Sequence, residues 1–105
     1  MSFFELLKKP DINEGVELFR NTEGAVLIDV RTPREYRDGH IPGSKNVPLQ
    51  FLEDMGTVAE DLDTPVFVYC QSGARSRQAA AILDRMGYRN VKNLGGIAAW
   101  NGETE

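Results

Sequence analysis

Residues 66–76 read VFVYCQSGARS and contain the single cysteine of a 105-residue chain. The run from Val66 to Tyr69 is β-branched and aromatic, which is typical of a buried strand. Small polar residues follow Cys70, and an amphipathic helical pattern begins at Arg75. A strand, a tight turn and a helix in this order predict one unit of a parallel α/β sheet, with the cysteine at the carboxyl end of its strand.

The rest of the chain continues this alternation of strands and helices. The expected strands are runs of strand length: residues 25–28, a short one at 46–48, residues 65–69 and a last one from Val91. The expected helices are marked by caps, stops and apolar spacing: starts at Ser2 and Asp11, a helix from Thr32 to Gly39, residues 49–63 with an interruption near Gly56, residues 75–86, and a terminal helix carrying Trp100. We therefore expect an α/β fold, a small and mainly parallel sheet flanked by helices, in one domain over residues 1–105.

Apolar spacing also predicts which side of a helix is buried. In the helix that starts at Asp11, the inward residues are expected to be Ile12, Val16 and Phe19. In residues 75–86, they are expected to be Ala79, Ile82, Leu83 and Met86. Gly87 then ends the helix in a left-handed conformation, and Phe67 and Trp100 are expected in the core.

The composition is that of an ordinary globular protein, with 41% hydrophobic and 27% charged residues. A net charge of −4 argues against nucleic acid as the main partner, and no apolar run approaches the roughly 18 residues needed to span a membrane. A single cysteine cannot form an internal disulfide, so the fold needs no oxidising compartment. The first residues, MSFFELLKKP, do not have the pattern of a signal peptide. We therefore expect a cytoplasmic protein.

The residues around Cys70 suit a nucleophilic thiolate. The free N–H groups in the first turn of the following helix favour negative charge, and the small residues 72–74 let the backbone curl around an anion. Arg75 and Arg77 add positive charge. A free thiol with a pKa near 8.5 is only about 3% ionised at pH 7, whereas electropositive loops lower cysteine pKa values to roughly 3.5–7.5. A buried cysteine that only fills the core is the simpler alternative, and the strand-end position argues against it.

The segment Cys70–Ser76 matches the C-x-x-G-x-R-S loop of the rhodanese (thiosulfate sulfurtransferase) family, which the chain resembles. The resemblance extends over roughly residues 10–101 and includes further segments in the order of the family: Leu27–Arg31 with Glu35-Tyr36, Gly39–Ser44 with Asn46-Val47-Pro48, and Gly87-Tyr88, Val91, Leu94-Gly95-Gly96 and Trp100. Ser44, where alanine is common, is a small departure from that pattern.

The resemblance implies a sulfurtransferase that forms a persulfide on Cys70. The donor would be thiosulfate or another small anionic sulfur donor, and the acceptor would be cyanide, a thiol or a protein. The residues expected to bind the substrate are those of the loop: Gln71, Ser72, Gly73, Ala74, Arg75 and Ser76. Sulfite leaves without a proton relay, so no histidine is needed beside the thiolate, and neither a metal nor another cofactor is expected.

Two alternative functions stay open at this point. A cysteine-dependent phosphatase or arsenate reductase would use a similar loop, but only four residues separate Cys70 from Arg75, which suits a sulfur atom better than a phosphate, and no aspartate adjoins the loop. A sulfur-carrier or regulatory module that works only with a protein partner would have the same loop. His40, in a turn before Pro42, is expected to be a structural hydrogen-bonding residue.

Three further features have structural interpretations. Asp29 is expected to accept buried backbone N–H groups at the end of its strand, and Arg31 to pair with Glu35. The remaining feature is a modest basic patch, interpreted as solvated surface with a docking face for an acidic partner as the alternative: Arg85, Arg89 and Lys92.

Overall fold

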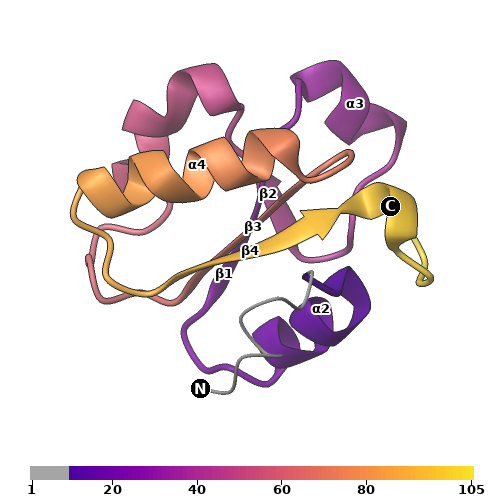
Figure 1. The fold of residues 1–105 in the computed structure, drawn as a ribbon, viewed down its shortest axis with the longest axis horizontal. Coiled ribbons are helices and arrows are strands. Elements are labelled where there is room, and N and C mark those ends of the chain that lie inside the picture. Colours follow the sequence, from indigo (N-terminus) through magenta and orange to yellow (C-terminus); the bar gives the residue numbers. More distant parts are fainter. Residues whose placement is uncertain (1–9) are drawn as a thin grey trace.

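The computed structural model describes residues 10–105, so the helix expected at Ser2 lies outside the described residues. Strands and helices alternate along the chain, as Figure 1 shows. The elements are α2 (Ile12–Arg20), β1 (Val26–Asp29), α3 (Pro33–Asp38), β2 (Ser44–Asn46), the 3₁₀ segment η1 (Leu49–Thr57), β3 (Val66–Cys70), α4 (Ala74–Arg85), β4 (Val91–Gly96) and the 3₁₀ turn η2 (Ile97–Ala99). No helix in this part of the chain is long and apolar enough to cross a membrane.

The four strands form one sheet in the order β2-β1-β3-β4, and every neighbouring pair is parallel. This confirms the predicted α/β class with a parallel sheet. The chain passes from β1 to β2 on one side and later adds β3 and β4 on the other, so the strand order reverses between β1 and β3. The carboxyl ends of these two strands, at Asp29 and Cys70, therefore lie at the kind of switch point where open α/β sheets bind ligands.

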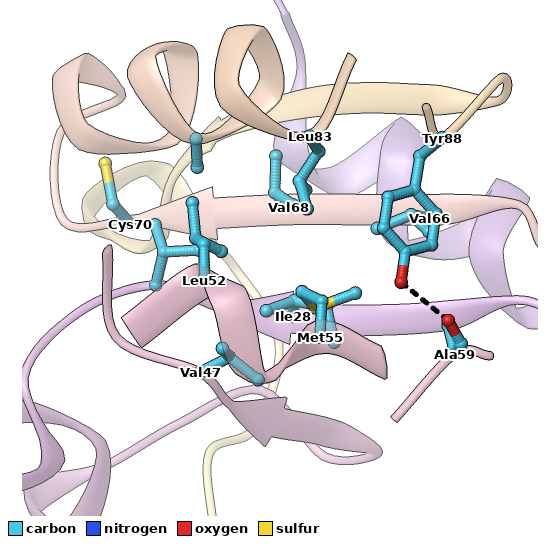
Figure 2. Close-up of a cluster of buried hydrophobic side chains, with 12 residues drawn as sticks. Ile28, Val47, Leu52, Met55, Ala59, Val66, Val68, Cys70, Leu83 and Tyr88 are labelled. Carbon is cyan, nitrogen blue, oxygen red and sulfur yellow. Dashed lines mark hydrogen bonds between the residues drawn. The ribbon is translucent and has the colours of Figure 1, made fainter. Parts of the chain in front are cut away.

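Helices cover both faces of the sheet, with η1 and α4 on one face and α2 on the other (Figure 1). Side chains of β3 alternate between the two faces, as the period of a strand requires. Val66, Val68 and Cys70 join the cluster under α4 and η1, which Figure 2 shows. Phe67 and Tyr69 join the second cluster with α2. All five side chains are buried, so β3 is the central strand of the core.

The predicted helix signals are confirmed at several termini. The Asp11 carboxylate accepts the N–H of Asn13 at 2.9 Å and so caps α2, whose Ile12 and Val16 are fully buried. Thr32 begins α3 with a reciprocal capping box. Gly87 follows α4 with a φ of +104°, a left-handed conformation that side chains disfavour.

Some predicted boundaries are wrong, because tertiary contacts decide them. The short strand is residues 44–46 rather than 46–48, since it pairs with β1 and Pro48 has no N–H to extend the ladder. The helix expected over residues 49–63 is a 3₁₀ segment that ends at Thr57, and its kink lies at Phe51 rather than at Gly56. A series of turns replaces its second half.

Two predictions at the carboxyl ends of helices are also wrong. Met86 is 38% exposed instead of inward, because the chain turns away at Gly87 and Tyr88 occupies the buried position. The Tyr88 hydroxyl donates to the carbonyl of Ala59 at 2.6 Å, which Figure 2 shows as a dashed line. The terminal helix is the single turn η2, and Trp100 lies just beyond it, packed against the second cluster.

Candidate active site

The thiol of Cys70 lies at the junction of strand, loop and helix that the sequence predicts. The residue ends β3 and is 1% exposed, and Figure 2 shows its sulfur beneath the start of α4. Gly73 is the residue before α4 and has a φ of +105°, which favours glycine there. This conformation turns the Gly73 N–H back toward the sulfur, to which it donates at 3.0 Å. The short loop therefore closes around the thiol.

The hydroxyl of Ser76, in the first turn of α4, is the second polar group at the sulfur. Ser76 is fully buried, and the thiol donates to its Oγ at 3.4 Å. The Oγ in turn lies 3.1 Å from the carbonyl of Gly73 and 3.3 Å from that of Gly95. When the thiol loses its proton, the hydroxyl can rotate and donate to the thiolate instead. Ser76 thus has a partner in both protonation states of the cysteine.

The environment favours the ionised form of the thiol. Burial raises the pKa of Cys70, but hydrogen bonds from the Ser76 hydroxyl and from the N–H groups of Ser76, Gly73 and Ser72 lower it by more. The pKa of the thiol therefore lies below its ordinary value, as short-range donors aimed at an anion require. A buried thiol with a lowered pKa is suited to nucleophilic chemistry.

The ion pairs at this end of the sheet differ from the predicted ones. Arg31 was expected to pair with Glu35, but it pairs with Asp29, with Nη2 2.8 Å from the carboxylate. Glu35 instead receives both Nη atoms of Arg75, at 2.7 and 2.9 Å. The pairs differ because the side chains leave their elements in different directions. Arg31 turns back along β1 to the buried carboxylate of Asp29, whereas Glu35, at the start of α3, faces the start of α4. The Arg75 guanidinium holds the pKa of Glu35 at about 2.

Arg31 also connects β1 to the active-site loop. Its Nη1 donates to the side-chain oxygen of Gln71 at 3.2 Å, and its Nη2 donates to the carbonyl of Gly39 at 2.7 Å. Asp29 accepts the backbone N–H of Arg31 at 2.9 Å, in agreement with its predicted structural role. The buried pair of Asp29 and Arg31 therefore supports the first residue of the loop.

The other predicted residues have these surroundings. Gln71, Ser72, Gly73 and Ala74 form part of the wall of an open cavity beside the loop. His40 stacks on the ring of Tyr36 at 3.7 Å, and its Nδ1 lies 2.9 Å from the Tyr36 carbonyl, which is the predicted structural role. In the basic patch, Arg89 pairs with Asp63.

The family model for the rhodanese-like domain matches residues 13–103 of the chain. The chain belongs to the rhodanese-like family. A sulfurtransferase of Allochromatium vinosum is 45% identical over 82 residues, which cover 76% of this chain and 75% of the relative. Thiosulfate sulfurtransferase PspE of Escherichia coli is 42% identical over 71 residues, which cover 67% of this chain and 68% of the relative.

The fold agrees with this membership. A solved structure described as a rhodanese with anions from Escherichia coli superposes with a TM-score of 0.73 at 38% identity, covering 77% of this chain and 96% of that one. Together these relatives support a rhodanese-type enzyme.

Sequence reasoning missed three features of this rhodanese-like site: the pair of Glu35 and Arg75, the bond from Arg31 to Gln71, and the contact of the Ser76 hydroxyl with the sulfur. One signal in the sequence could have indicated the pair of Glu35 and Arg75. The capping box places Glu35 at the start of a helix that follows β1, and parallel neighbouring strands bring such helix starts to the same edge as the loop.

Proposed function

We propose that this chain is a sulfurtransferase that moves a sulfane sulfur through a persulfide on Cys70. The observation that carries the proposal is the buried thiol, whose sulfur receives the Gly73 N–H at 3.0 Å and lies 3.4 Å from the Ser76 hydroxyl. These donors favour a thiolate and would also face the negative charge of a persulfide. Relatives named as sulfurtransferases and as thiosulfate sulfurtransferases support the same reaction.

The transfer takes place in two steps, formation of the persulfide and transfer of its outer sulfur. The thiolate of Cys70 attacks the outer sulfur of thiosulfate, a new sulfur–sulfur bond forms, and the old one breaks as sulfite leaves with its electron pair. Cyanide or an acceptor thiolate then attacks the outer sulfur of the persulfide, and Cys70 leaves as a thiolate. Splitting the transfer in this way is ordinary nucleophilic catalysis. No proton has to move within either step, so no general base is needed beside the sulfur.

Intact-mass spectrometry tests this proposal. After incubation with thiosulfate, the protein should gain the mass of one sulfur atom on Cys70 and lose it again when cyanide is added. The control is Cys70→Ser, which is nearly isosteric and should fold but gain no sulfur and produce no thiocyanate. Sulfur transfer that persists in this variant would show that another group carries the reaction.

Turnover kinetics separate this proposal from the alternatives. A carrier module that acts only with a protein partner would form the persulfide but would not turn over with free cyanide or thiols. A phosphatase would need a cation at the loop to bind the phosphate group. Arg75 is already held by Glu35 through two hydrogen bonds, which disfavours this alternative. Hydrolysis of a phosphate ester without persulfide formation would favour the phosphatase instead.

We also propose that residues 1–105 act as one rhodanese-like domain, in a cytoplasmic and reducing environment that keeps the cysteine free. The partners are a small anionic sulfur donor and a cyanide, thiol or protein acceptor, without nucleic acid or membrane.

A further inference from the structure

Cys70 lies between two residues that are both tied to the same turn of the chain. This turn, residues 39–44, joins α3 to the start of β2. Tyr69, just before the cysteine, contacts the turn directly through its hydroxyl. Gln71, just after the cysteine, contacts it through Arg31, whose guanidinium bridges the Gln71 side chain and the carbonyl of Gly39. Two separate links thus run from this turn to the nucleophile.

The hydroxyl of Tyr69 is the direct link. The residue is fully buried, and its phenol oxygen accepts the N–H of Ile41 at 3.1 Å and lies 3.0 Å from the Oγ of Ser44. The Ser44 hydroxyl donates its one proton to the carbonyl of Ile41 at 2.7 Å, so its oxygen is left to accept the proton of Tyr69. Burial raises the pKa of Tyr69 far above its ordinary value, so the phenol keeps this proton at neutral pH. The sulfur-transfer steps make no use of this buried group.

The backbone on both sides of Cys70 is fixed as well. The carbonyl of Tyr69 accepts the N–H of Val30 at 3.0 Å, and the carbonyl of Gln71 accepts the N–H of Ala98 at 3.1 Å. The carbonyl of Tyr69 belongs to the peptide bond that leads into Cys70, and the hydroxyl of the same residue is held at the far end of its side chain. The strand therefore has little freedom just before the sulfur.

The turn that receives these links is held from two sides. His40 and Glu105 exchange both of their backbone hydrogen bonds, at 3.1 and 2.9 Å. The hydroxyl of Tyr36, in α3, donates to the carbonyl of Ser44 at 2.6 Å. A segment that is itself anchored in this way suits a support for residues that hold a reacting group in place.

We propose that Tyr69 is a positioning residue for the nucleophile, and that its hydroxyl, anchored on residues 39–44, keeps the sulfur of Cys70 at its contacts with Gly73 and Ser76. These contacts are 3.0 Å from the Gly73 N–H and 3.4 Å from the Ser76 Oγ, so a small shift of the end of β3 weakens both. Tyr69 exerts this effect from the other face of the sheet, since its ring packs with α2 and the sulfur lies under α4. The inference rests on the proposed function, in which Cys70 is the nucleophile.

The experiment compares Tyr69→Phe with a matched control, Tyr88→Phe. Each variant keeps the ring and removes one buried hydroxyl, but the Tyr88 hydroxyl donates to Ala59 at the opposite end of its cluster from Cys70, as Figure 2 shows. Both variants should melt at a lower temperature than the parent protein, so the assays are run well below the lowest melting temperature. One assay is the single-turnover rate of persulfide formation from thiosulfate, followed by intact mass. The other is the pH dependence of alkylation of Cys70 by iodoacetamide, which requires no sulfur transfer.

The two assays report on position rather than on stability. In Tyr69→Phe, the rate of persulfide formation should fall about threefold to tenfold, since a misplacement of about 1 Å can cost roughly a hundredfold. Its alkylation profile should move to higher pH, because the weakened donors hold the thiolate less well. In Tyr88→Phe, both results should match those of the parent protein. Ser44→Ala, which keeps the bond from Ile41 to Tyr69, should show the same two changes at a smaller size.

A Tyr69→Phe protein that melts lower but keeps the rate and the alkylation profile of the parent would overturn the proposal and leave the hydroxyl with a structural role. Equal changes in Tyr69→Phe and Tyr88→Phe would overturn it too. If Tyr69→Phe does not fold, Ser44→Ala decides, and parent-like results in both assays refute the positioning role. Persulfide formation in the parent protein reports separately on the proposed function. If the parent gains no sulfur, that function fails, while the alkylation profiles still decide the role of Tyr69.

Discussion

Replacing Ser76 by alanine should raise the pKa of the active-site thiol and make the loss of activity depend on pH. Ser76 is fully buried, and its Oγ lies 3.4 Å from the sulfur of Cys70. Its hydroxyl is the main group that lowers the pKa of Cys70, against the effect of burial. The alanine variant keeps the backbone N–H groups but loses this donor.

The size of the effect follows from the charge of the acceptor. A hydrogen bond to a charged group contributes about 1.5–3 kcal/mol, so its loss should disfavour the thiolate by about tenfold or more at pH values below the pKa of the thiol in both proteins. Turnover at those pH values should fall in proportion to the thiolate fraction. The difference from the parent protein should narrow as the pH rises and both thiols ionise.

The assay is the rate of alkylation by iodoacetamide as a function of pH, followed by mass spectrometry, together with the pH profile of sulfite release. Because the chain has one cysteine, the alkylation signal comes from Cys70 alone. Ser72→Ala is the matched control, since Ser72 lowers the pKa of Cys70 through its backbone N–H, which the substitution retains. A thermal melt establishes that both variants are folded. Parallel pH profiles for Ser76→Ala and the parent protein, with an equal loss at every pH, would refute the reasoning and leave Ser76 with a purely structural role.

Two further predictions concern the ion pairs around the loop. The pKa of Glu35 lies at about 2 instead of 4.5, so its pairing with Arg75 should stabilise the fold above pH 4.5, and this contribution should be lost as the pH falls toward 2. After allowance for solvent screening it should amount to about 1–2 kcal/mol, and denaturant titrations of Glu35→Gln should lack that part of the acid dependence. Arg31→Ala leaves the buried carboxylate of Asp29 without its guanidinium and should cost about 3–5 kcal/mol of unfolding free energy. A thermal melt unchanged from that of the parent protein would contradict the structural role of Arg31.

The features that could be predicted from the sequence are those that depend on local chemistry. Asp11 and Thr32 cap their helices because a short acceptor side chain precedes the first turn, and this depends on only a few neighbouring residues. Gly87 ends α4 for a similarly local reason. The position of Cys70 follows from an apolar run that gives way to a small-residue turn. The order of these units predicts the parallel sheet.

The features that could not be predicted depend on which segments meet in space. Near the loop, Arg31 and Arg75 pair with two acidic residues, and spacing in the sequence does not determine which of them pair. The direction of each side chain from its own element decides that Arg75, rather than Arg31, reaches Glu35. The cavity is equally non-local, because Pro10 and the residues of β4 and η2 complete a wall that begins at Gln71.

The pairing of the arginines determines how the site stabilises negative charge. Arg31 and Arg75 are each held by a carboxylate, so their positive charges near the loop are largely neutralised. The thiolate of Cys70 is therefore stabilised chiefly by N–H groups and one hydroxyl at contact distance. Such donors are enclosed with the buried sulfur, where salt screens little, whereas an exposed charge such as Arg77 is screened within a Debye length of about 10 Å at 0.1 M salt. Removing one of the enclosed donors should therefore change the ionisation of Cys70 more than removing an exposed charge does.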